Sequence, residues 1–208
     1  MTIYDLKPAF QNLLRPICKT LANVGVTANQ VTVLALVVSL IVGALFAMNP
    51  GTRWAAALIP VWLFLRMALN AIDGMLAREH HMQSELGGIL NELGDVIADA
   101  ALYLPFALVA GFSPVLVVAV VIISILTEMA GVVAVQVGAS RRYDGPMGKS
   151  DRAFVFGLLA LLLGLGFDLE WWANAALAIV AILSALTVIN RSAKALKELS
   201  ANDEDKSM

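Results

Sequence analysis

Carboxylate and amide side chains recur at helical spacing inside two apolar stretches of this 208-residue sequence. Asn70 and Asp73 are three residues apart, so they share one face of a helix. Asn91 and Asp95 are four residues apart and share a face of the next helix. Oxygen ligands that converge from two helices suit Mg²⁺, a hard cation usually shared with substrate phosphates. The same residues also fit two other hypotheses: hydrogen bonding between helices without chemistry, and a proton relay that includes Asp99.

Arg66 and Asp99 extend this pattern deeper into the apolar part of the chain. The two helices are antiparallel and joined by a short loop, so depth can be counted from that loop at about 1.5 Å per residue. The count puts Arg66 level with Asp99, one layer beyond Asn70 and Asp95. Because a charge in hydrocarbon needs a partner, we predict a structural ion pair between Arg66 and Asp99. Glu128, in another apolar stretch, has no evident partner in the sequence.

The composition that surrounds these residues is that of a membrane protein. Sixty per cent of the residues are apolar and 14% are charged, and the mean hydropathy is +0.81. A soluble domain carries roughly 25% charged residues, so an ordinary cytosolic globule, a disordered chain and a coiled coil are excluded. One cysteine, Cys18, and two adjacent histidines leave no internal disulfide and make a histidine-based zinc site improbable.

Six apolar stretches predict an all-α membrane protein with six transmembrane helices. They cover residues 29–48, 54–77, 87–111, 114–137, 153–167 and 169–189. The fifth stretch is shorter than the roughly 20 residues that span a bilayer, so we expect Asp151 and Arg152 to join its first turn or the helix to tilt little.

The distribution of positive charge predicts the orientation. Twelve of the 14 Lys and Arg residues fall on one side of the six helices, together with both termini. Arg53 alone lies on the other side, and Arg66 lies inside the second stretch. Positively charged segments stay in the cytoplasm, so we expect both termini and the polar site to face the cytoplasm.

The chain divides into three parts. Residues 1–28 form a juxtamembrane segment with an amphipathic helix over 3–21 that lies on the inner leaflet. Residues 29–191 form the six-helix domain. Residues 192–208 form a polar cytoplasmic tail, and its end, 200–208, is expected to be disordered.

The segment from Asn70 to Asp95 resembles the signature of the CDP-alcohol phosphotransferases, D-x-x-D-G-x-x-A-R-x₈-G-x-x-x-D-x-x-x-D. The spacing fits throughout, and the matching residues are Asp73, Gly74, Ala77, Arg78, Gly87 and Asp95. Asn70 and Asn91 stand where the family has its first and third aspartates. Residues 27–32 resemble a second family motif, T-P-N-x-[LIV]-T, at the start of the first helix. The sequence is therefore similar to a divergent bacterial member of this family.

The resemblance implies an enzyme of phospholipid biosynthesis. It implies transfer of a phosphatidyl or similar group from a CDP-linked donor, with CDP-diacylglycerol expected, to a small polar acceptor alcohol, with release of CMP. The protein is then a multi-pass homodimer of the bacterial inner membrane, surrounded by lipids and without a nucleic-acid partner.

The resemblance also implies roles for individual residues. One or two Mg²⁺ or Mn²⁺ ions are expected on Asn70, Asp73, Asn91 and Asp95, and Asp95 is the expected catalytic base. Nucleotide contacts are expected from Thr32, Gly74, Ala77, Arg78 and Gly87. The asparagines remove two negative charges, so either one metal suffices, or Glu92, Asp99 or Glu128 restores the charge, or the protein is inactive.

A cationic cluster between the fourth and fifth stretches is a second candidate site. With a residue after the sixth stretch, its cations are Arg141, Arg142, Lys149, Arg152 and Arg191. They suit a phosphorylated polyol acceptor, and they equally suit contact with anionic lipid headgroups. Two alternatives to an enzyme are a catalytically inactive lipid- or nucleotide-binding scaffold and a transporter, although no inverted repeat is evident.

Overall fold

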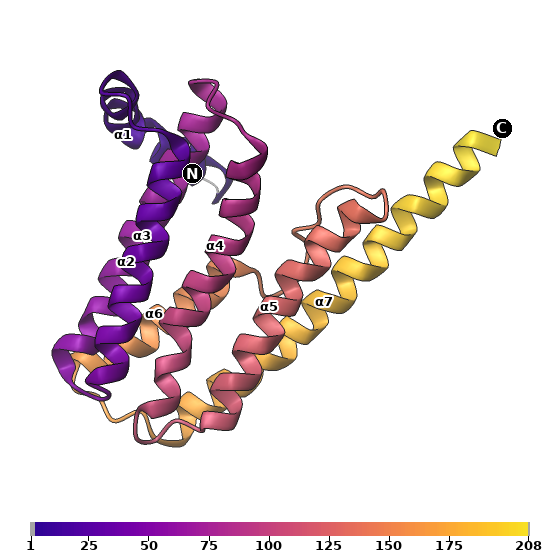
Figure 1. The fold of residues 1–208 in the computed structure, drawn as a ribbon. Coiled ribbons are helices and arrows are strands. Elements are labelled where there is room, and N and C mark those ends of the chain that lie inside the picture. The colour runs from indigo at the N-terminus through magenta and orange to yellow at the C-terminus, as the bar shows by residue number, and fades with distance from the viewer. Residues whose placement is uncertain (1–2, 208) are drawn as a thin grey trace.

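The computed structural model describes residues 3–207, which fold entirely into helices joined by loops (Figure 1). The helices are α1 (Ile3–Asn23), α2 (Ala28–Met48), α3 (Arg53–Glu79), α4 (Glu85–Tyr103), the 3-10 helix η1 (Leu104–Leu108), α5 (Pro114–Gln136), α6 (Lys149–Leu165) and α7 (Glu170–Ser207). The predicted all-α class is confirmed within these residues. The predicted N-terminal helix is present as α1, which packs on α3.

Four helices are long and apolar enough to cross a membrane, namely α2, α3, α5 and the Trp171–Asn202 part of α7. The other two predicted spans differ for physical reasons. Helix α6 has only 17 residues, and α4 carries Glu85, Glu92, Asp95 and Asp99. All four acidic side chains lower the mean hydropathy of α4, and Glu92, Asp95 and Asp99 line a polar cavity described below.

The helices form two groups that meet around α4 (Figure 1). Helix α3 packs on α2 and α6, α2 also packs on α4, and α5 runs along α7. The apolar core lies in the half away from α1 and includes stacked and edge-on rings of Phe46, Tyr103, Phe106 and Phe156. This packing leaves the polar residues of α3 and α4 in the other half.

Two caps fix where the site-bearing helices begin. The Thr27 side chain accepts from the Gln30 amide at the start of α2, and the Gln30 side chain accepts from the Thr27 amide. At the start of α4, the Ser84 hydroxyl accepts from the Gly87 amide at 3.0 Å. Asn29 donates to the same hydroxyl at 3.3 Å. The N-terminal ends of α2 and α4 are therefore held side by side.

Two helix ends differ from those predicted, and the start of α6 confirms one of the two alternatives expected for the fifth stretch. The third apolar stretch leaves the α-helix at Tyr103, where Pro105 cannot donate a backbone hydrogen bond, and continues as η1. Helix α6 begins at Lys149 and includes Asp151 and Arg152, as predicted. The disorder predicted for 200–208 is wrong over 200–207, because α7 continues to Ser207 and its residues Ala195 and Leu199 pack against Ala134 and Ala139.

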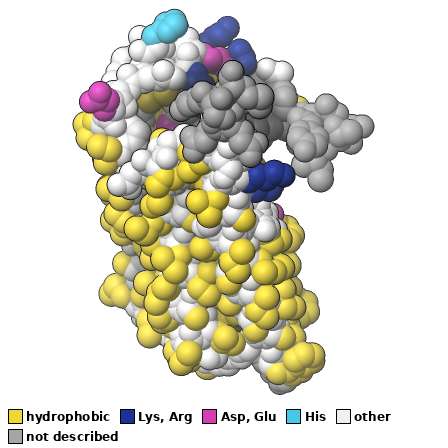
Figure 2. All heavy atoms as spheres, turned by 90° about the vertical axis from the view of Figure 1, so that its right-hand side faces the viewer, with side chains coloured by type: hydrophobic (Ala, Val, Ile, Leu, Met, Phe, Trp, Pro, Cys, Tyr) yellow, Lys and Arg dark blue, Asp and Glu magenta, His cyan; other side chains and the backbone are white. Residues whose placement is uncertain are grey.

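The outer surface separates apolar from charged side chains. The face in Figure 2 is covered mainly by hydrophobic side chains, while Lys, Arg, His and acidic side chains gather toward the end that carries α1. The exposed apolar residues include Ile122 of α5 and Ile179 and Ile182 of α7. This is the surface that a lipid bilayer favours.

Candidate active site

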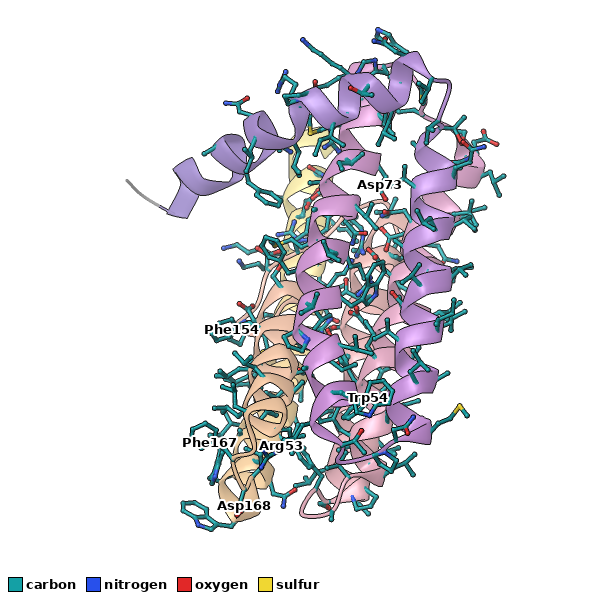
Figure 3. All side chains as sticks on the ribbon, turned by 90° about the vertical axis from the view of Figure 1, so that its left-hand side faces the viewer. Arg53, Trp54, Asp73, Phe154, Phe167 and Asp168 are labelled. Atoms are coloured by element: carbon teal, nitrogen blue, oxygen red, sulfur yellow. The ribbon has the colours of Figure 1, made fainter. Side chains whose placement is uncertain are left out.

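Asp73 lies on α3 in the half of the molecule nearer α1, whereas Arg53 and Asp168 lie at the opposite end (Figure 3). The carboxylate of Asp73 is buried, with 6% of the residue exposed. The Thr32 hydroxyl of α2 donates to Asp73 Oδ2 at 2.9 Å. The sequence predicted both residues for the site, and the cap at Thr27 positions α2 for this contact.

A cavity of about 340 Å³ opens beside Asp73 between α2, α3 and α4. All five residues predicted to contact the nucleotide line it: Thr32, Gly74, Ala77, Arg78 and Gly87. Asn29, Ser84 and Asn91 line it as well. A Cβ atom on Gly74 would lie 2.9 Å from Arg78 Nη2, so the glycine leaves room for the arginine over the helix. Sequence reasoning missed Ser84, although a serine directly before an apolar helix is a common N-cap signal.

Asp95 of α4 is surrounded by donors. Arg66 Nη2 donates to Asp95 Oδ1 at 3.0 Å, and Asn70 Nδ2 donates to the same oxygen at 3.2 Å. The Lys149 ammonium at the start of α6 forms an ion pair with Asp95 Oδ2. The predicted neighbours Asn70 and Asp95 are thus in direct contact, and Lys149 joins them from a distant part of the chain.

The predicted ion pair between Arg66 and Asp99 is confirmed. Arg66 Nη1 donates to Asp99 Oδ1, and both residues are buried, with 4% and 5% exposed. The guanidinium therefore bridges Asp95 and Asp99 on successive turns of α4.

A second cavity of about 340 Å³ is lined by Asp95 and Asp99, and it shares Asn91 with the cavity beside Asp73. Three of the five predicted acceptor-binding cations line it: Arg141, Lys149 and Arg191. Arg142 and Arg152 do not line it. Arg142 pairs with Asp144 and Glu198, and Arg152 is fully buried.

Glu128 of α5 anchors the wall of this second cavity. Its carboxylate is 2.8 Å from Arg152 Nη2, 3.4 Å from Arg191 Nη1 and 3.6 Å from Arg141 Nη2. Arg141 also makes a two-point contact with Glu92, at 2.7 and 3.1 Å. No pattern in the sequence indicated these partners, because they come from separate helices and a loop.

An apolar groove of about 640 Å³ runs between α3 and α6. Its walls are apolar side chains such as Leu63, Phe64 and Leu161, and Phe154 at its margin points outward from α6 (Figure 3). Arg66, Asn70 and Lys149 form its polar end. The groove therefore leads from the outer surface to the donors that surround Asp95.

The donor chemistry beside Asp73 fits a hard cation. One carboxylate and the amide oxygens of Asn70 and Asn91 are oxygen ligands of the kind that Mg²⁺ takes when substrate phosphates and water complete its shell. Within the described residues, no three His, Cys, Asp or Glu side chains are grouped to hold a metal by themselves. A cation here would therefore depend on amide oxygens and on the substrate.

Comparison with known proteins shows one consistent family. The family profile described as CDP-alcohol phosphatidyltransferase matches residues 25–189. The chain is 47% identical over 191 residues to the inner membrane protein YnbA of Escherichia coli K12, covering 92% of this chain and 94% of that protein. It is 28% identical over 196 residues to the phosphatidylinositol phosphate synthase of Mycolicibacterium smegmatis, covering 89% and 84% of the two chains.

Solved structures show the same fold. The phosphatidylinositol phosphate synthase of Mycobacterium tuberculosis with CDP-DAG bound has a TM-score of 0.72 at 22% identity, over 86% of this chain and 92% of that one. The same synthase in complex with manganese and citrate also has a TM-score of 0.72 at 22% identity, over 87% and 88%.

Proposed function

The chain belongs to the CDP-alcohol phosphatidyltransferase family, and from this premise we propose that it transfers a phosphatidyl group from CDP-diacylglycerol to a small phosphorylated alcohol. The second product is CMP. The reaction is a step of phospholipid biosynthesis, and the protein is an enzyme.

One observation carries the choice of donor and acceptor: three cavities lie in a row, and Asp95 lines the middle one. The cavity beside Asp73 and the second cavity share Asn91. The second cavity and the apolar groove share Lys149 and Ser150. A donor that carries both a nucleotide and acyl chains needs a polar cavity and an apolar groove within reach of each other, and the cationic cavity between them suits an acceptor that carries a phosphate.

Residues of the chain have separable tasks in this proposal. Arg78 binds a phosphate of the donor, and Gly74 and Gly87 let the nucleotide approach the helix backbones. The acceptor hydroxyl oxygen bonds to the phosphorus that carries diacylglycerol, and the bond from that phosphorus to the CMP oxygen breaks. The hydroxyl proton passes to the Asp95 carboxylate, and CMP leaves with the bonding electron pair. Arg141, Lys149 and Arg191 hold the phosphate of the acceptor.

A divalent cation, Mg²⁺ or Mn²⁺, would be held by Asp73 with Asn70 and Asn91, and it would supply positive charge against the donor diphosphate.

The one-sided distribution of Lys and Arg supports six spans in a bacterial inner membrane, with both termini and the cavities facing the cytoplasm. The relative YnbA is named an inner membrane protein. A homodimer, which the family resemblance implies, completes the proposal.

Release of radiolabelled CMP from CDP-diacylglycerol, measured with a panel of alcohols, tests the function. We expect release with a phosphorylated acceptor, and its loss in Asp95→Asn with much less effect on donor binding. Asp168→Asn is the matched control, since Asp168 is an exposed carboxyl at the opposite end of the molecule. Donor binding without CMP release in the presence of any acceptor would contradict transfer and favour a non-catalytic binding protein.

A further inference from the structure

We propose that the site holds a single divalent cation, on the Asp73 side, and that Lys149 and Arg66 supply fixed positive charge beside Asp95 in place of a second ion. This inference rests on the proposed function in one respect, that a nucleoside diphosphate binds together with a divalent cation. It assigns to Lys149 a task that is separate from acceptor binding.

The charges around the two polar cavities are mostly paired. Six acidic side chains line these cavities: Asp73, Glu92, Asp95, Asp99, Glu128 and Asp151. Four of them form ion pairs with Arg or Lys. Among the described residues, Asp73 and Asp151 have no Lys or Arg nitrogen within 4.0 Å. Asp151 is exposed and accepts from the Gly148 amide at the start of α6 at 2.8 Å, whereas Asp73 is buried and its contact is the Thr32 hydroxyl. A cation therefore finds buried, uncompensated negative charge at Asp73.

Both carboxylate oxygens of Asp95 are already in contact with nitrogen donors. Its two carboxylate oxygens take the Arg66 guanidinium, the Asn70 amide and the Lys149 ammonium. A metal bound to Asp95 would have to displace the ammonium or lie beside it, and like charges at such separation repel strongly in a site of low dielectric. Arg66 cannot move away cheaply, because it is buried and also pairs with Asp99.

An asparagine at position 70 suits this arrangement because its amide can donate to Asp95. The amide of Asn70 donates to Asp95 Oδ1 at 3.2 Å, and a carboxylate at this place would have no proton to donate. It would instead add a negative charge next to Asp95. The amide nitrogen of Asn70 therefore acts with Lys149 and Arg66 in balancing Asp95, while its amide oxygen is the atom proposed as a ligand of the cation on the Asp73 side.

A count of bound ions tests the proposal without using activity. Wild-type protein in detergent, saturated with CDP, is titrated with Mn²⁺, and free Mn²⁺ is followed by its electron paramagnetic resonance signal. We expect one bound Mn²⁺ per chain, and none in Asp73→Asn. Two ions per chain would overturn the single-ion site and leave the proposed function intact. No bound ion would overturn both this inference and the cation of the proposed function, whereas CMP release is measured separately.

A variant that restores a metal-binding charge pattern sharpens the count. In Asn70→Asp combined with Lys149→Met, one carboxylate is added and the competing ammonium is removed, so we expect a second Mn²⁺ to bind. The matched control is Lys194→Met, which removes an ammonium from its pair with Asp144 outside the cavities and keeps one ion. A folded double variant that still binds one ion contradicts the role of Lys149. If the double variant does not fold, the wild-type count alone decides.

Discussion

At the residue scale, Asp73 has the most specific expected role. Its carboxylate is buried beside the cavity that Gly74 and Arg78 line, and it lacks a cationic partner among the described side chains. We predict that Asp73→Ala weakens Mg²⁺-dependent binding of CDP by roughly tenfold or more, about 1.4 kcal/mol. Calorimetry in detergent measures it, with Asp168→Ala as control. Unchanged CDP affinity in the presence of Mg²⁺ would remove Asp73 from the cation site.

Arg66 and Asp99 give a second prediction, about stability. Asp99→Leu leaves the buried Arg66 guanidinium without one of its two carboxylates, and we expect it to lower the free energy of unfolding by about 3–5 kcal/mol. Thermal unfolding in detergent measures the change.

The double variant separates structure from chemistry. Arg66→Leu with Asp99→Leu replaces the pair by apolar groups, and it should recover much of the lost stability. Because Arg66 also contacts Asp95, the recovered protein should show altered CMP release. A double variant as unstable as Asp99→Leu would count against a simple structural pair.

At the element scale, the C-terminal part of α7 holds the loop that carries Arg141, one of the proposed acceptor-binding cations. Glu198 accepts from the Ser140 amide at 2.9 Å, from the Ser140 hydroxyl at 2.8 Å and from Arg142 Nη1 at 2.6 Å. Asp144 pairs with Lys194 at 2.7 Å. The Lys194 ammonium, with Arg142, holds the pKa of the Asp144 carboxyl below its ordinary value. These contacts fix the loop between α5 and α6.

Glu198 is therefore a positioning residue. We predict that Glu198→Gln raises the KM for the phosphorylated acceptor by roughly three- to tenfold with little change in kcat, because it loosens Arg141 and its neighbours without removing them. Lys197→Gln, on the same helix, is the control and should leave both constants unchanged. A fall in kcat at constant KM would contradict a positioning role.

The predictable part of the site lies on one helical hairpin. Arg66, Asn70 and Asp73 could be matched with residues of α4 because a short loop sets the register of two antiparallel helices. The pairing of Glu128 with Arg152 and Arg191 could not be predicted, since these contacts span 24 and 63 residues. They depend on how α5, α6 and α7 pack, which the spacing of polar residues does not determine.

At the scale of the whole molecule, the orientation in the membrane is the main prediction. In a Cys18→Ala background, Asp168→Cys should react with a membrane-impermeant maleimide added to intact cells. Ser200→Cys should react only after the cells are opened, because the proposed topology places the end of α7 in the cytoplasm. Both positions are exposed. Labelling of Ser200→Cys in intact cells would reverse the proposed topology.

The prediction of six spans and the four helices that are apolar enough to cross a membrane differ at α4 and α6. By length and composition, α2, α3, α5 and α7 qualify as membrane-spanning helices. Helix α4 has a lower mean hydropathy because it carries Asp95 and Asp99, and α6 begins with charged residues of the candidate site. Both helices that fail the apolar criterion therefore bring charged residues of the candidate site to the interior. Their polar residues are shielded by packing against α2, α3 and α5.

The most direct test of transfer is the stoichiometry of its two products. Purified protein in liposomes that contain CDP-diacylglycerol is given Mg²⁺ and a phosphorylated polyol, and both CMP and new phospholipid are quantified by mass spectrometry. We expect equal amounts of the two products, and neither product without the acceptor or the divalent cation. CMP formed without a matching phospholipid would show hydrolysis in place of transfer and would contradict the proposed function.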